Sequence, residues 1–253
     1  MAFLALSSSR LYNGPFALKQ SSIFELSYNK KTESWGGWNI LKMENRLKVL
    51  SLSNCNGVKQ IPDFSGCVSL EILSLAHCVS LQEVDSSIGK LKDLTHLQII
   101  SCLNLRNLPK EIGGLVNLKH FSIRRCSKIK KLPDIRKLAS LSKLDISHTK
   151  ITILPDSIGN AKNLSSLDLL GTSIAELPIS IGELTQLEFL SLCGCHNFVE
   201  LPESIGYLTK LQMLDLSGTK IIELPNSIKN LKRLRVMRMA SCQYEVAGPV
   251  LEC

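Results

Sequence analysis

Hydrophobic residues in this chain follow one pattern that repeats in tandem. In the stretch from Leu211 to Arg233, leucine occupies the first, fourth and sixth positions, Thr219 the ninth, and a Leu-Pro pair follows. Closely similar strings of 23 residues begin at Leu141 and at Leu164, the second starting where the first ends. A unit that recurs at a fixed, short period predicts a stack of similar coils, each packed mainly on its neighbours.

The two parts of the unit predict two kinds of local structure. The alternation in L-x-x-L-x-L has period two, so the leucines face one side of a strand, and strands of successive coils pair in parallel. After Leu-Pro, apolar residues recur every three positions, which suits a short 3₁₀-like turn, while proline ends the strand ladder. We therefore expect an α/β fold, a leucine-rich repeat solenoid. It would form a curved horseshoe with a parallel β-sheet on the concave face and short helical or irregular segments on the convex face.

The chain divides into three parts by the regularity of this pattern. Residues 1–46 hold irregular N-terminal repeats, residues 47–242 hold regular repeats of 23–24 residues, and residues 243–253 form a truncated C-terminal tail. The regular coils begin at Leu47, Leu70, Leu94, Leu118, Leu141, Leu164, Leu187, Leu211 and Leu234.

The ninth position of the unit is either cysteine or threonine, and the choice correlates with the spacing that follows. After cysteine the next apolar residue comes three positions later, as from Cys126 to Ile129, and after threonine two positions later, as from Thr149 to Ile151. Both side chains are small and can donate a hydrogen bond to a backbone carbonyl left unpaired where the strand turns. We interpret the correlation as two turn geometries that enter the same ladder.

Cysteine usage and charge narrow the setting of the protein. The nine cysteines are an odd count, and their repeat register favours buried free thiols in a reducing compartment over bridges or a metal site. The formal net charge of +8 permits acidic partners without naming one. The start of the chain lacks the basic region and apolar length of a signal peptide, and no stretch reaches transmembrane length. We expect a cytoplasmic or nuclear protein with no membrane span.

Catalysis and nucleic-acid binding have little support in the sequence. No Ser-His-Asp or Cys-His group can be assigned to a pocket, and no phosphate-binding G-x-x-x-x-G-K-[ST] loop occurs. Outward positions carry too few aromatics to stack the bases of a single strand. We therefore expect a protein that is not an enzyme, binds no cofactor or metal, and contacts proteins rather than nucleic acid.

Candidate contact residues lie at the outward strand positions, because the inward positions are occupied by the core. Stacking of adjacent coils predicts a basic row of His96, His120 and Lys143, with Arg124 and Arg125 as anchors for an acidic partner surface. The alternative interpretation is a solvated face that happens to be basic. The complete candidate set for the protein-binding concave face is His77, His96, Gln98, His120, Arg124, Arg125, Lys143, Asp145, His148, Asp168 and Asp215.

Aspartates form a second outward row, Asp145, Asp168 and Asp215, interrupted by Ser191. Such acids can pair with the neighbouring basic row or accept hydrogen bonds from exposed strand amides, and we favour this structural interpretation. A further basic cluster lies on the turn and return of one coil: Lys128, Lys130, Lys131, Arg136 and Lys137. Nuclear import or phosphate contact is one interpretation of this cluster, and a solvated edge is the one we favour.

The alternation of L-P-x-S-I-G-x-L units with Cys-type and Thr-type turns resembles the leucine-rich repeats of plant intracellular nucleotide-binding immune receptors. The segment from Trp35-Gly36-Gly37-Trp38 through Pro62-Asp63-Phe64-Ser65-Gly66 looks most like the class with an N-terminal TIR domain. The resemblance covers roughly residues 23 to 242. It implies a disease-resistance function in which the repeats recognise a pathogen effector or host protein, or hold a nucleotide-binding domain inactive.

The chain departs from that family in lacking the phosphate loop and in opening inside a coil, so we expect a fragment or truncated form of a larger receptor. The alternative is a cytosolic scaffold of the Ras-associated leucine-rich repeat type, which binds signalling proteins constitutively. In both cases the partner is a protein, and contact with it runs over several adjacent coils.

Overall fold

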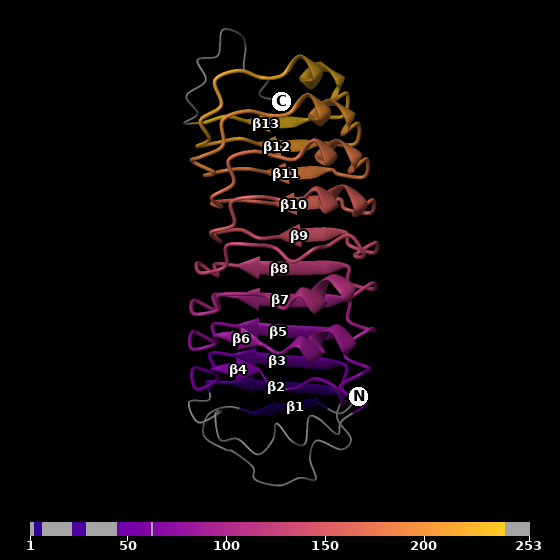
Figure 1. The fold of residues 1–253 in the computed structure, drawn as a ribbon, viewed down its shortest axis with the longest axis vertical. Helices are drawn as coiled ribbons and strands as arrows, with labels where there is room; N and C mark the ends of the chain where they lie inside the picture. The colour runs from indigo at the N-terminus through magenta and orange to yellow at the C-terminus, as the bar shows by residue number, and fades with distance from the viewer. Residues whose placement is uncertain (1–2, 7–21, 29–44, 62, 241–253) are drawn as a thin grey trace.

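The computed structural model describes residues 3–6, 22–28, 45–61 and 63–240. Within these ranges the coils stack in chain order from β1 at one end to β13 at the other (Figure 1). The predicted C-terminal tail, 243–253, lies outside the described residues, as does most of the irregular N-terminal part.

A parallel sheet of eleven strands runs the length of the described array, with neighbouring strands taken from successive coils. The prediction of one L-x-x-L-x-L strand per coil is thereby confirmed. The strands are β1 (Phe3–Leu6), β2 (Ile23–Ser27), β3 (Val49–Ser53), β5 (Ile72–Ala76), β7 (His96–Ile100), β8 (His120–Arg124), β9 (Lys143–Asp145), β10 (Ser166–Asp168), β11 (Phe189–Ser191), β12 (Met213–Asp215) and β13 (Val236–Arg238).

Equivalent repeat positions pair with each other throughout this sheet. Leu97 of β7 lies opposite Phe121 of β8, which lies opposite Leu144 of β9. Because side chains alternate between the two faces of a strand, this register places every inward leucine on the next one and every outward residue in a row. The inward residues form one continuous buried core along the stack.

The return segment of most coils contains a short 3₁₀-helix, and the prediction of 3₁₀-like turns is confirmed. In all but the first of these helices a proline, such as Pro155, holds the N-cap position with extended backbone. The helices are η2 (Ser86–Lys90), η3 (Lys110–Gly114), η4 (Asp156–Asn160), η5 (Ile179–Glu183), η6 (Glu203–Tyr207) and η7 (Asn226–Asn230).

The returns of three coils carry other features. In the coils that begin at Leu47 and Leu70, the short strands β4 (Gln60–Ile61) and β6 (Glu83–Val84) pair in parallel, and η2 follows β6. The coil that begins at Leu118 returns without a 3₁₀-helix, and its backbone passes so close to η3 that an added Cβ on Gly113 would lie 2.1 Å from the Asp134 carbonyl oxygen.

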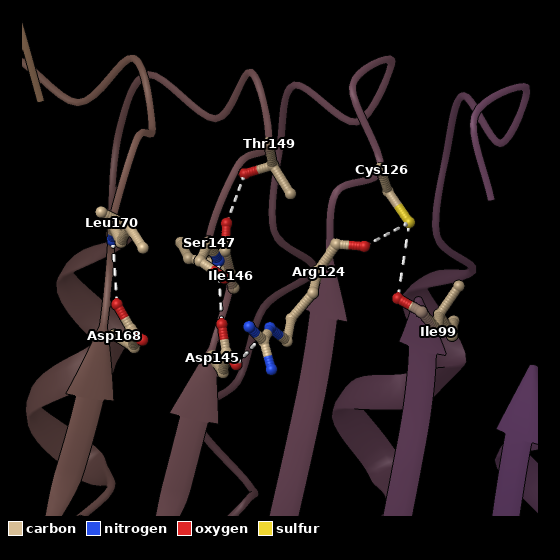
Figure 2. A network of polar contacts seen from close by, with 9 residues as sticks. All are labelled: Ile99, Arg124, Cys126, Asp145, Ile146, Ser147, Thr149, Asp168 and Leu170. Carbon is tan, nitrogen blue, oxygen red and sulfur yellow. Dashed lines mark hydrogen bonds and ion pairs between the residues drawn. The ribbon is translucent and has the colours of Figure 1, made fainter. Parts of the chain in front are cut away.

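The ninth-position residues bind backbone carbonyls at the end of the strands, as predicted. The Cys126 thiol lies 3.4 Å from the Ile99 carbonyl oxygen of the preceding coil, and the Thr149 hydroxyl donates to the Ile146 carbonyl of its own coil at 2.8 Å (Figure 2). The Cys126 thiol also lies 3.5 Å from the Arg124 carbonyl oxygen of its own coil, so it bridges two coils, whereas the Thr149 hydroxyl bonds within its coil. Both turn geometries thus have the same function, which is to satisfy a buried backbone carbonyl.

The thiols of this ladder are buried among the apolar side chains of the core. Cys78, Cys102, Cys126 and Cys195 form no disulfide. Burial raises the pKa of the Cys195 thiol, because the thiolate would lose its hydration. A buried thiol with a raised pKa is a poor nucleophile, so Cys195 acts as a small core residue.

Candidate functional site: the outward face of the large sheet

Three basic candidates stack on one another at the middle of the outward sheet face. His96 pairs in register with His120, which pairs with Lys143, so the predicted row is confirmed. The two imidazole rings lie 4.3 Å apart between centroids and are tilted by 51°. Next to them, the Thr95 hydroxyl lies 2.8 Å from His96 Nδ1, which holds that ring in place.

The electrostatics of this row favour an uncharged His120. Partial burial lowers the pKa of His120, and the neighbouring His96, Lys143 and Lys119 lower it further. Each of these groups makes a second positive charge costly at this place. An anion that settled on the row would reverse the effect, because it would stabilise the imidazolium.

Arg124 is less available than its outward position suggested. It lies at the end of β8, opposite Ser147 in the extended register, and its Nε lies 3.2 Å from Asp145 Oδ2 on the next coil (Figure 2). The pair is partly exposed, with side-chain accessibilities of 47% and 26%, so it contributes little to stability. The pair does place a carboxylate against the Arg124 guanidinium, so this guanidinium is not available as an uncompensated positive charge.

The aspartate row has the structural role that the sequence favoured. Asp145, Asp168 and Asp215 each accept a hydrogen bond at 3.0 Å from the backbone N–H two residues later. These positions are in register from β9 to β12, and Ser191 on β11 takes the place of an aspartate between Asp168 and Asp215. Burial raises the pKa of Asp168, with a further contribution from the nearby Asp145 charge.

Three other candidates occupy an edge rather than the face. His77, Arg125 and His148 all have positive φ, near 55°, in the turn that directly follows the strand. Later coils place glycine at this point, with Gly171 beside the ring of His148. A left-handed backbone is unfavourable for residues with a Cβ. These residues therefore lie in the turns at the ends of the strands, beside the row rather than within it.

The remaining candidate, Gln98, lies on β7 in the same row as Asp145, with Ser122 between them. Its Oε1 is 3.5 Å from the Ser74 hydroxyl on the preceding coil. The structure also adds a residue that the sequence analysis did not select: Arg238, whose Nη1 lies 3.7 Å from Asp215 Oδ2. Extending the aspartate row by one coil would have found it, because Arg238 occupies the equivalent strand position.

The chemistry available at this face is recognition by charge and hydrogen bonding. Among the described residues, no three His, Cys, Asp or Glu side chains are grouped so that they could hold a metal ion. In the same part of the chain, every helix is too short or too polar to cross a membrane.

Comparison with known proteins agrees with this architecture. Residues 131–197 and 180–248 match a model that describes a leucine-rich repeat region. A leucine-rich repeat protein of Leptospira interrogans has a similar structure, with a TM-score of 0.51 and 22% identity over 91% of this chain and 75% of that one. The leucine-rich repeat domain of the type III effector XopL gives a TM-score of 0.58 and 23% identity, covering 96% of this chain and 77% of that domain.

A third similar structure is the functional domain of InlJ from Listeria monocytogenes, which includes a cysteine ladder. Its TM-score is 0.52 and its identity 17%, over 92% of this chain and 56% of that chain. Sequence identities this low define the fold only. The fold is that of a leucine-rich repeat solenoid, with its outward sheet face made of residues that the repeat does not dictate.

Proposed function

We propose that this protein is the recognition part of a plant intracellular nucleotide-binding immune receptor, and that it binds a protein partner through the outward sheet face of β7 to β9. The repeat motifs support the receptor assignment through their resemblance to that family. The partner is a pathogen effector, a host protein or the nucleotide-binding domain of the same receptor.

One observation carries the proposed binding face: three cations at this face form no ion pair. Lys119, Arg125 and Lys143 are exposed around the stacked histidines, and within the described residues none of the three forms an ion pair. The fold does not require a cation at any of these positions, because other coils place serine, glycine or glutamate at the equivalent points. Unpaired charge on a preformed face is suited to an acidic protein surface.

The test is a binding measurement with charge reversal on the face and a matched control elsewhere. A partner is first recovered by proximity labelling in plant cells, and its affinity is then measured for Arg125→Glu combined with Lys143→Glu. Lys232→Glu combined with Arg233→Glu makes the same change of charge at exposed residues outside the face. We expect at least a tenfold loss for the first variant and wild-type affinity for the second. Equal affinities would refute the proposed face.

The receptor assignment has a separate test in the transcript. We expect the reading frame that encodes this chain to contain a nucleotide-binding segment with a G-x-x-x-x-G-K-[ST] loop. A full-length transcript without that segment would refute the receptor assignment and favour a free-standing scaffold.

A further inference from the structure

A strip of exposed side chains runs along the array on the return segments, away from the outward sheet face. It consists of the two positions that directly precede each Leu-Pro or its equivalent, and we call it the return strip. From the coil at Leu94 to the coil at Leu211, its members are Arg106, Asn107, Lys130, Lys131, Thr152, Ile153, Ala175, Glu176, Val199, Glu200, Ile222 and Glu223, all of them exposed.

Backbone hydrogen bonds hold successive coils together at this strip. The N–H of Lys150 donates to the Ile129 carbonyl at 2.9 Å, and the N–H of Ser173 donates to the Ile151 carbonyl at 3.0 Å. Earlier in the array, the pairing of β4 with β6 places equivalent strip positions side by side. Strip residues on adjacent coils are therefore neighbours, about 5 Å apart as in a parallel sheet.

The charge of the return strip changes sign at its middle. On the two coils before Ile153 the strip is basic, with Lys131 on the adjacent coil and Arg106 on the next, and the coil before these carries Glu83 at the strip. After Ile153 it is acidic, with Glu176, Glu200 and then Glu223 on successive coils. Ile153 itself lies at the change of sign and is 63% exposed.

This arrangement is unfavourable for an isolated chain. Like charges on neighbouring strands repel, and in the described part of the chain the strip lysines, arginine and glutamates form no ion pair. Apolar side chains accompany the glutamates, since Val199 is 51% and Ile222 69% exposed. The core needs neither the charges nor the exposed aliphatics, so the strip fits a surface that a partner covers.

From this pattern we propose that the return strip is a self-association surface, on which a second copy of this chain docks in antiparallel orientation around a two-fold axis at Ile153. Such an axis maps the strip onto itself with its direction reversed. It sets Lys131 of one copy against Glu176 of the other, sets Arg106 against Glu200, and brings the two Ile153 side chains together. The aliphatic stem of Arg106 then covers Val199.

A second copy fits both the basic and the acidic part of the strip on the five coils from Leu94 to Leu187, whereas a basic partner fits only the acidic part and an acidic partner only the basic part. Outside these coils the axis sets Glu83 of one copy against Glu223 of the other, which is a like-charge approach. Two-fold symmetry doubles every favourable contact, because each pair occurs twice in the dimer. Lys150 and Asp156 flank the strip on the axial coil, where each approaches its own counterpart. These two like-charge approaches keep the association reversible and sensitive to salt.

Sedimentation equilibrium at low ionic strength, over a wide range of protein concentration, measures this association. Glu176→Lys with Glu200→Lys makes the facing residues of both halves basic, and Arg106→Glu with Lys131→Glu makes them acidic. We expect each double variant to raise the dimer dissociation constant at least tenfold. An equimolar mixture of the two variants is expected to form a mixed dimer, because every contact then joins opposite charges again. The chain with all four changes is expected to dimerise by itself.

Asp93→Lys with Glu188→Lys is the matched control, since both acids are exposed and lie outside the strip. It should dimerise like the wild type, and circular dichroism confirms that each variant is folded. A monomeric wild type would overturn the proposal, as would double variants that dimerise normally or a mixture that stays monomeric. These outcomes are independent of the proposed binding face, because no strip residue belongs to it.

Discussion

Replacing Thr149 by valine tests whether the ninth-position residue stabilises the coil through its hydrogen bond. The Thr149 hydroxyl, 1% exposed, donates to the Ile146 carbonyl at 2.8 Å (Figure 2). Valine has nearly the same shape, so the cavity and strain contributions are small. The change removes the donor and leaves the carbonyl in a site that water does not reach, since Ile146 is fully buried. Loss of one partner from a buried hydrogen bond costs about 1–3 kcal/mol.

The matched control is Thr152→Val in the same coil, where the side chain is exposed. Urea denaturation followed by circular dichroism gives the free energy of unfolding of both variants. We expect Thr149→Val to lose about 1–3 kcal/mol, and we expect the control to stay within about 0.5 kcal/mol of the wild type. Thr149→Cys should recover part of the loss, since cysteine fills this position in other coils. Two valine variants of equal stability would refute the reasoning that the ninth residue is selected for its donor.

Two further predictions concern close packing and protonation. Gly113→Ala should destabilise by about 2 kcal/mol or more, because its Cβ would lie 2.1 Å from the Asp134 carbonyl oxygen. Gly114→Ala should be tolerated, since the atom nearest to its added Cβ lies 3.7 Å away. Thermal unfolding compares the two variants, and equal losses of stability would contradict this view. His120 has a lowered pKa in the folded state, so the unfolded chain binds more protons in the window below the ordinary histidine range. Its contribution to stability is complete above that range and falls as pH drops through the lowered pKa. His120→Asn should reduce the loss of stability on acidification in urea titrations at a series of pH values, and an unchanged pH profile would contradict the assignment.

The leucine pattern was sufficient to predict most of the fold, because each inward position has one physical task. Leu97, Leu144 and their equivalents must fill a ladder of constant width, so their spacing specifies strand, register and coil boundary together. The alternation of Cys126-type and Thr149-type turns was also predictable, since both residues are small donors beside a buried carbonyl. These features depend on repetition, which a single sequence shows directly.

Contacts between unlike residues on adjacent coils were harder to predict. The sequence placed Arg124 and Arg125 together as anchors, but Asp145 on the next coil pairs with Arg124, and Arg125, with its positive φ, lies in the turn at the end of the strand. Side-chain length and rotamer decide the first outcome, and the turn geometry decides the second. Neither is encoded in repeat spacing.

A leucine-rich repeat solenoid presents its chemistry in rows, because equivalent positions stack along the array. A single substitution in one coil therefore changes one element of a row, and a surface emerges only from several coils read together. The row from His96 to Lys143 is basic over adjacent coils, while the return strip changes sign at Ile153. The outward sheet face thus suits an acidic partner. The return strip suits a second copy of this chain in antiparallel orientation, because its basic part then faces the acidic part of the other copy. The two surfaces lie on different segments of each coil, so both can be occupied in one assembly.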